Sequence, residues 1–186
     1  MEAYEQFVAL ALEAEGLVVS SALKFPVARQ TPSGLQTHGY EVDLIGARAD
    51  KLVLATVKSF FGSIGVMADH VSGAGANKTH TSRYKLLNDA PLRSKVVTLA
   101  AERFGYAVSQ VELRLYVGKF GPKDNEERTR AWCKSQVVGA GPIKVLGAPE
   151  VVKVVRHLAR PKQYRDSAVL ATIKVLNAAG ALVEGP

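Results

Sequence analysis

Residues 39–59 read GYEVDLIGARADKLVLATVKS, and they contain two apolar runs of strand length. The runs cover residues 40–46 and 51–59, and the roughly four residues between them suit a hairpin loop. Asp43 lies in the first run and Lys58 in the second. A charge within an apolar strand needs a partner, a metal ion or a catalytic role. We therefore expect two adjacent strands that bring Asp43 and Lys58 into one site.

Further elements are predicted on the N-terminal side and directly after this hairpin. Apolar residues at helical spacing predict a helix over residues 2–15, ended by Gly16. Residues 17–23 predict a strand, and the Pro-, Gly- and Thr-rich residues 26–38 predict a loop. The glycine-rich residues 60–81 predict a mobile surface loop.

The second half of the chain alternates between helical and extended patterns. Residues 91–104 predict a helix and residues 111–117 a strand, so a crossover should place this strand parallel to the 51–59 strand. Further helices are predicted at 124–135, 149–159 and 166–179, with a short strand at 143–146. We expect a core over residues 1–120, and an α/β extension over residues 121–186 that packs on it.

Composition indicates a conventional globular protein. Of 186 residues, 47% are hydrophobic and 22% are charged, which excludes wholesale disorder. Cys133 is the single cysteine, and the four histidines are too scattered for a zinc site. No apolar run approaches the roughly 18 residues of a membrane span. We expect a soluble, intracellular protein of the cytoplasm that does not associate with membranes.

The net charge of +7 is divided unevenly along the chain. Residues 1–82 hold six Lys and Arg against eight Asp and Glu, giving −2, whereas residues 83–186 hold 18 against nine, giving +9. Lysines and arginines that neutralise phosphates release counterions, so this division favours a polyanionic partner. A basic surface that serves only solubility is the alternative.

The spacing of Asp43 and Lys58 resembles the signature of the PD-(D/E)XK nucleases, the restriction-endonuclease-like superfamily. In that signature an Asp ends one strand, and a carboxylate-x-Lys triplet lies on the next. The resemblance covers roughly residues 1–120, and its motif about 20 of them. It implies an α/β fold with an αβββαβ core and a mixed central sheet, followed here by the C-terminal helices.

The resemblance also implies a metal-dependent site. In the superfamily the Asp and the triplet carboxylate hold Mg²⁺ or Mn²⁺, and the lysine orients the attacking water, which suits the preference of Mg²⁺ for hard oxygen ligands. Asp43 matches the first position and Lys58 the last, but Thr56 stands where the triplet has its carboxylate. A neutral threonine cannot offset a divalent charge, so magnesium binding by Asp43 alone should be weak.

A missing carboxylate could come from Glu41. If Gly46 pairs with Lys51 across the hairpin, Asp43 faces Leu54, and Glu41 faces Thr56 on the same side of the sheet. Glu41 would then complete a metal site with Asp43. The alternative is an Asp43 that is simply ion-paired with Lys58.

Glu5, on the first helix, corresponds to an acid that many such nucleases carry there to support a metal-bound water. The alternative for Glu5 is a solvated residue on the surface of the helix.

Three functions remain open at this level. The first is an atypical or weakened Mg²⁺-dependent nuclease with Asp43, Glu41, Glu5, Thr56 and Lys58 at its site. The second is a catalytically inactive relative that retains nucleic-acid binding, with DNA favoured. The third is a protein-interaction module on the same fold, because a fold alone does not determine function. Many enzymes of this type pair to cut both strands, which is compatible with a homodimer.

Overall fold

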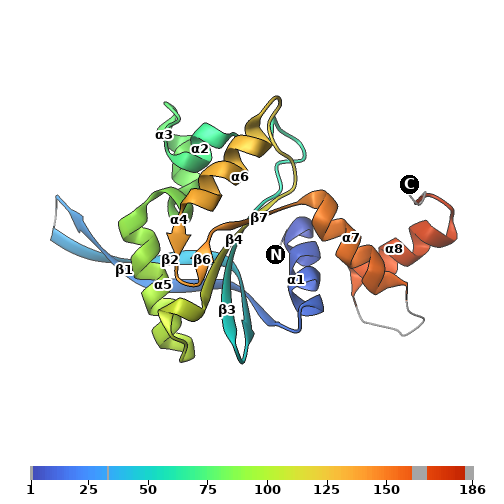
Figure 1. Ribbon diagram of the computed structural model, residues 1–186, viewed down its shortest axis with the longest axis horizontal. Helices are drawn as coiled ribbons and strands as arrows, with labels where there is room; N and C mark the ends of the chain where they lie inside the picture. Colours follow the sequence, from blue (N-terminus) through green and yellow to red (C-terminus); the bar gives the residue numbers. More distant parts are fainter. Residues whose placement is uncertain (1, 33, 161–166, 183–186) are drawn as a thin grey trace.

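The computed structural model describes residues 2–32, 34–160 and 167–182 as an α/β protein built on a mixed five-stranded sheet (Figure 1). The predicted α/β class with a mixed central sheet is therefore confirmed. The strands follow the order β1-β2-β3-β4-β7. Neighbours are antiparallel from β1 to β3 and parallel from β3 to β7, so the predicted parallel pair of residues 51–58 and 111–117 is confirmed. The strands are β1 Val18–Thr31, β2 Gly34–Arg48, β3 Lys51–Lys58, β4 Val111–Val117 and β7 Lys144–Gly147.

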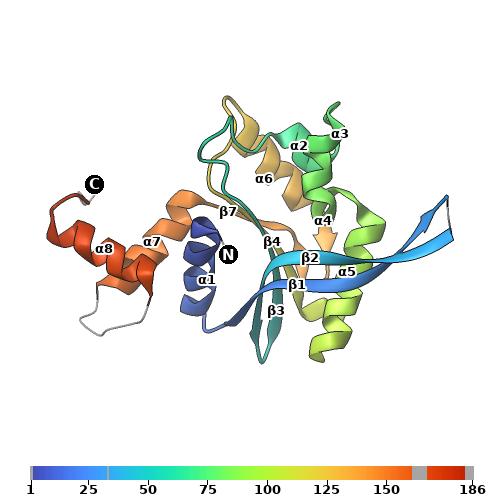
Figure 2. The same ribbon diagram turned by 180° about the vertical axis from the view of Figure 1, so that it is seen from behind.

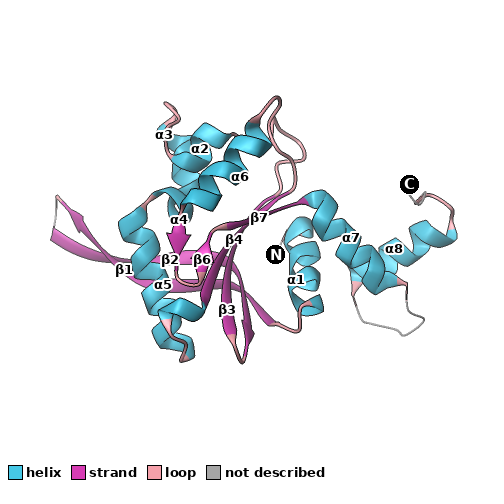
Figure 3. Ribbon diagram, viewed as in Figure 1, coloured by secondary structure: helices cyan, strands magenta, loops and turns pink. Residues whose placement is uncertain are grey.

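Helices cover both faces of the sheet (Figure 3). One face packs against α1 and α7, with α8 packed on α7, and the other packs mainly against α4 and α5, with α2 and α6 at its edge. Residues alternate between the faces along β3, where Leu52 and Leu54 belong to one core cluster and Val53 and Ala55 to the other. Burial on both faces explains why β3 is almost continuously apolar between its terminal lysines. The helices are α1 Ala3–Ala14, α2 Ala68–Ser72, α3 Lys78–Thr81, α4 Lys85–Asn88, α5 Ala90–Phe104, α6 Asn125–Ser135, α7 Ala148–Ala159 and α8 Ala168–Ala178.

Most predicted elements are confirmed within a few residues. The helix predicted at 2–15 is α1, the helix at 91–104 is α5, and the strand at 111–117 is β4. Ser167 caps α8 through its hydroxyl, and the predicted start of that helix at residue 166 lies outside the described residues. Strand β7 pairs with β4, so part of the predicted C-terminal extension belongs to the central sheet. The boundary near residue 120 stays a prediction.

The loop predicted over residues 26–38 is wrong. Strands β1 and β2 continue as an antiparallel hairpin as far as the pair Thr31↔Gly34, and this arm, whose described residues are 26–32 and 34–39, reaches away from the rest of the sheet (Figure 2). Pro26 is tolerated because β1 is an edge strand, where a missing backbone N–H costs no ladder bond.

The loop predicted over residues 60–81 is only partly a loop, because it contains α2 and α3. Gly73 ends α2 in the left-handed region at φ 84°. The Asn77 side chain then begins α3 by accepting the N–H groups of Thr79 and His80. Turn-forming residues at these two points act as helix caps rather than as breaks in all regular structure.

The predicted register of the central hairpin is also wrong. Gly46 pairs with Val53 rather than with Lys51, and the turn is shorter than expected because Arg48 pairs with Lys51. Arg48 and Asp50 form a two-point ion pair, with N–O distances of 2.6 and 2.9 Å, beside this turn. The pairing therefore slides by two residues, which keeps every side chain on the same face.

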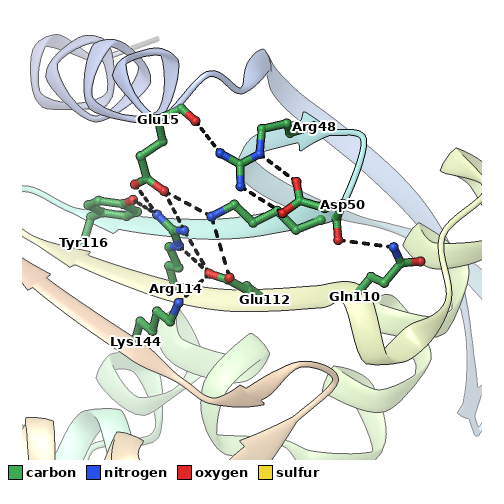
Figure 4. A network of polar contacts seen from close by, with 9 residues as sticks. Glu15, Arg48, Asp50, Gln110, Glu112, Arg114, Tyr116 and Lys144 are labelled. Atoms are coloured by element: carbon green, nitrogen blue, oxygen red, sulfur yellow. Dashed lines mark hydrogen bonds and ion pairs between the residues drawn. The ribbon is translucent and has the colours of Figure 1, made fainter.

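A buried ion network joins the end of α1 to β4 (Figure 4). The Arg114 guanidinium, 4% exposed, donates to Glu15 at 2.6 and 3.0 Å and to Glu112 at 2.8 Å. It also donates to the Tyr116 hydroxyl at 3.2 Å. Lys51 and Lys144 complete the charge balance around the two glutamates. A buried guanidinium with this many partners is satisfied, which identifies the network as structural.

In the part of the chain that the structure describes, no helix combines the length and the apolar character needed to cross a membrane.

Candidate functional site

Asp43 lies where the strand ladders on both sides of β2 are interrupted. The last pair of the β2–β3 ladder is Leu44↔Ala55, so the ladder stops at the residue next to Asp43. On the other side, the β1 ladder passes from Ser21↔Leu44 to Leu23↔Val42, and the intervening Ala22 has a φ of 54°. Interruptions of this kind redirect a side chain and are common beside functional sites.

The Asp43 carboxylate takes the place of a ladder partner for β3. Its Oδ2 accepts the Val57 N–H at 2.7 Å and the Thr56 hydroxyl at 3.1 Å. The Lys58 ammonium donates to the same oxygen at 3.4 Å and to the Val57 carbonyl at 3.1 Å. The structure thus brings together three of the predicted site residues, Asp43, Thr56 and Lys58.

These residues open into a cleft of about 390 Å³ between α1, the end of β3 and the segment after α3. The side chains of Asp43 and Lys58 remain 24% and 17% exposed, so a ligand in the cleft can reach both. The Arg83 guanidinium lies 6.0 Å from the centre of the Phe60 ring, an arrangement that supports a cation–π contact. The described lining residues are Glu2, Glu5, Asp43, Val57, Lys58, Ser59, Phe60 and Arg83.

Glu5 lines this cleft, but its carboxylate also has a local role. Its Oε2 accepts the backbone N–H of Glu2 at 2.9 Å, which completes a capping box at the start of α1. Glu2 in turn accepts the Ser59 hydroxyl at 3.4 Å. Glu5 is therefore near the predicted site while helping to fix the start of its own helix.

Glu41 is placed elsewhere. It pairs with Lys24 across β1, with a distance of 3.6 Å between Nζ and Oε2, and its side chain is about half exposed. It is not among the described residues that line the cleft. The expectation that Glu41 faces Thr56 depends on the hairpin register that the structure corrects.

The donor set at Asp43 does not fit a magnesium site in this arrangement. A hard divalent cation needs several oxygen ligands, with carboxylates as the usual protein share. Here Asp43 Oδ2 is shared by three donors, one of them cationic, and Thr56 offers only a neutral hydroxyl that donates to Asp43. Among the described residues no three His, Cys, Asp or Glu side chains are grouped so that they could hold a metal ion.

Arg83 is the residue of this cleft that the sequence does not reveal. It lies 25 positions after Lys58 in the chain, and α2 and α3 fold it back over the end of β3. No local pattern around Arg83 predicts that return, because the intervening residues read as a loop.

Comparison with known proteins adds no family assignment: no protein-family model matches the chain, and no curated protein matches it. The functional argument therefore rests on the geometry of the cleft and on the charge of the surfaces beside it.

Proposed function

We propose that this protein binds DNA through a nuclease-like core, and that the Asp43–Lys58 cleft is a weakened or inactive phosphodiester site. The order α1, β1, β2, β3, α5, β4 supports a restriction-endonuclease-like αβββαβ core. Asp43 and Lys58 lie on its second and third strands, as the resemblance to PD-(D/E)XK nucleases implies.

One observation carries the proposal: Lys58 and Arg83 face one cleft from segments far apart in the chain. Two cations of this kind can hold phosphate, Lys58 as a point charge and Arg83 with a two-pronged guanidinium. The Asp43 contact holds the Lys58 ammonium at the cleft, so its side chain is positioned before a ligand arrives. A phosphate could then bind in the cleft without a rearrangement of the Lys58 side chain.

Thr56 explains why catalysis should be weak. It is 7% exposed and donates its hydroxyl proton to Asp43. It therefore cannot supply the negative charge that the triplet carboxylate gives to an active nuclease of the resembled superfamily. The cleft keeps groups that hold a phosphodiester but lacks this ligand for a cation.

The test is fluorescence anisotropy with labelled duplex DNA at several salt concentrations, with and without EDTA. We expect the affinity to fall steeply as the salt concentration rises, because counterion release drives the binding. EDTA should leave the affinity unchanged. Lys58→Ala and Arg83→Ala should each weaken DNA binding. Lys134→Ala, at an exposed position on α6, is the control, and its loss of affinity should be no larger than the loss of one positive charge causes. Equal affinity at low and high salt would overturn the proposal, and no binding at low salt would favour a protein partner.

Weakened metal-dependent hydrolysis is the second candidate: Glu2 and Glu5 line the same cleft as Asp43, although in this structure the three acids are not grouped closely enough to hold a metal ion. It predicts slow cleavage of plasmid or single-stranded DNA in Mg²⁺ or Mn²⁺ that Lys58→Ala abolishes. Cleavage that survives Lys58→Ala comes from a contaminant and removes this candidate.

A further inference from the structure

A second pocket lies between the arm and the start of α5. Its volume of about 370 Å³ falls at the lower end of the range of roughly 300–1,000 Å³ found for small-molecule sites. The described lining residues are Val27, Ala28, His38, Gly39, Tyr40, Lys85, Asp89, Pro91, Leu92 and Lys95. The arm forms one wall and helices α4 and α5 the other, so neither element makes the pocket alone.

The pocket has apolar walls and one fixed aromatic ring. Val27 and Leu92 contribute apolar surface, and both pack against the core. The Tyr40 hydroxyl accepts the Leu86 N–H at 3.1 Å, which ties the ring to the start of α4. Burial and, to a lesser degree, the charge of Asp43 raise the pKa of Tyr40 to about 12, so its phenol stays neutral. An apolar slot with a fixed aromatic ring suits the planar face of a nucleobase.

The charges around the pocket favour an anion. Among its described lining residues, Lys85 and Lys95 stand against a single acid, Asp89. The Asp89 carboxylate accepts the Leu92 N–H at 3.1 Å as the cap of α5, so it serves the helix end. The whole arm, residues 26–39, contains no Asp or Glu. Phosphates could therefore approach along the arm without meeting a negative charge.

The pocket is next to the Asp43–Lys58 cleft along two separate segments. Arg83 lines the cleft and Lys85 lines the pocket, two residues apart. Tyr40 lines the pocket and Asp43 lines the cleft, three residues apart on β2. One extended strand could thus contact both sites.

We propose that this pocket holds one nucleotide of a single DNA strand, with its base between the apolar walls and its phosphates at Lys85 and Lys95. The inference rests on the proposed function and deepens it: single-stranded or frayed DNA is the preferred form, because a base that is paired and stacked in a duplex must first leave the stack to enter the pocket.

The experiment compares a labelled oligo-dT strand with a blunt duplex by fluorescence anisotropy. Ala28→Trp fills the pocket without changing charge, and Ala171→Trp on the exposed face of α8 is the matched control. We expect Ala28→Trp to weaken single-strand binding about tenfold, as loss of one stacked base does, and to leave duplex binding nearly unchanged. Ala171→Trp should change neither.

A second variant tests the phosphate contacts. Lys85→Ala/Lys95→Ala should weaken single-strand binding more than duplex binding, whereas Lys134→Ala/Lys153→Ala, with the same loss of charge, should affect both alike. Thermal melting of each variant checks that the fold is retained.

The outcomes separate the two proposals. If Ala28→Trp and the lysine pair affect both DNA forms equally or not at all, while Lys58→Ala still weakens binding, the nucleotide pocket is overturned and the DNA-binding proposal stands. If the unaltered protein binds neither form at low salt, both proposals fail.

Discussion

Asp43 accepts the backbone N–H of Val57 at 2.7 Å, beyond the last paired residues of β2 and β3. The carboxylate thus replaces a backbone carbonyl as the partner of β3 and fixes the position of the following residue, Lys58. A side chain that does this has a structural role whether or not the cleft is catalytic.

This role predicts different effects for two substitutions of Asp43. Asp43→Ala leaves the Val57 N–H without an acceptor and removes the ion-pair partner of the Lys58 ammonium, which keeps only the Val57 carbonyl, and it should lower the free energy of unfolding by about 1–3 kcal/mol. Asp43→Asn keeps an oxygen that can accept the Val57 N–H, so its loss should be clearly smaller. Urea denaturation measures both, and equal losses would show that the charge rather than the hydrogen bond matters.

Thr56 is the position at which a metal site can be restored. Thr56→Glu supplies a second carboxylate beside Asp43, and two carboxylates are a usual protein share for a hard divalent cation. We expect calorimetry to detect Mn²⁺ binding to Thr56→Glu that the unaltered protein lacks or shows far more weakly. Thr56→Gln, with the same length and no charge, is the control. Equal Mn²⁺ binding by the Glu and Gln variants would contradict the expectation.

The buried Arg114 should be the most sensitive charge in the fold. Removing one partner of a buried ion pair typically costs about 3–5 kcal/mol, because the remaining charge is left uncompensated. Arg114→Ala removes the guanidinium partner of Glu112, whose side chain is only 14% exposed, and leaves it with Lys144 and Lys51, so the loss should lie toward the lower end of this range. Arg114→Lys keeps the charge but not the forked geometry, so its stability should lie between those of Arg114→Ala and the unaltered protein. A denaturation midpoint for Arg114→Ala close to that of the unaltered protein would refute this.

The same network predicts an acid-sensitive stability. Burial tends to raise the pKa of Glu15 and of Glu112, but the hydrogen bonds and charges of their basic partners outweigh it and lower both pKa values below 4.5. Carboxyls with a lowered folded pKa stabilise the fold above the unfolded pKa, and this contribution is lost as pH falls through the folded pKa. The melting temperature should therefore drop below pH 4.5, and it should drop less in Arg114→Ala than in Lys134→Ala. Parallel curves for the two variants would assign the acid sensitivity to other carboxyls.

The periodic elements could be predicted from sequence because their own residues determine them. The apolar residues of α1 recur at helical spacing, and apolar residues alternate along β4 from Val111 to Val117, so both elements were predictable. The arm was not, because Pro26 and Gly34 read as loop residues unless β1 is known to be an edge strand. The hairpin register was not either, because the turn between Arg48 and Lys51 is shorter than the spacing of the two apolar runs suggests.

The candidate site was likewise predictable only where the residues of one segment determine it. A charge flanked by apolar strand residues identified Asp43 and Lys58, and the structure places them 3.4 Å apart. Arg83 and the pocket at Tyr40 and Lys85 come from segments brought together by α2 to α5. Pattern within a single segment cannot reveal such a meeting, and the misread residues 60–81 concealed it further.

Gly118 gives a last prediction about how the strand end is held. Its N–H donates to the Lys58 carbonyl at 2.8 Å, and a Cβ built on it would lie 2.3 Å from the carbonyl oxygen of Ser59. Gly118→Ala must therefore displace the chain beside Lys58. We expect a loss of about 1–3 kcal/mol in the free energy of unfolding, as for overpacking, together with weaker DNA binding because Lys58 shifts. Gly62→Ala is the matched control, since a Cβ at Gly62 meets nothing within 4 Å. If Gly118→Ala melts and binds DNA as Gly62→Ala does, the close approach at Ser59 does not position Lys58.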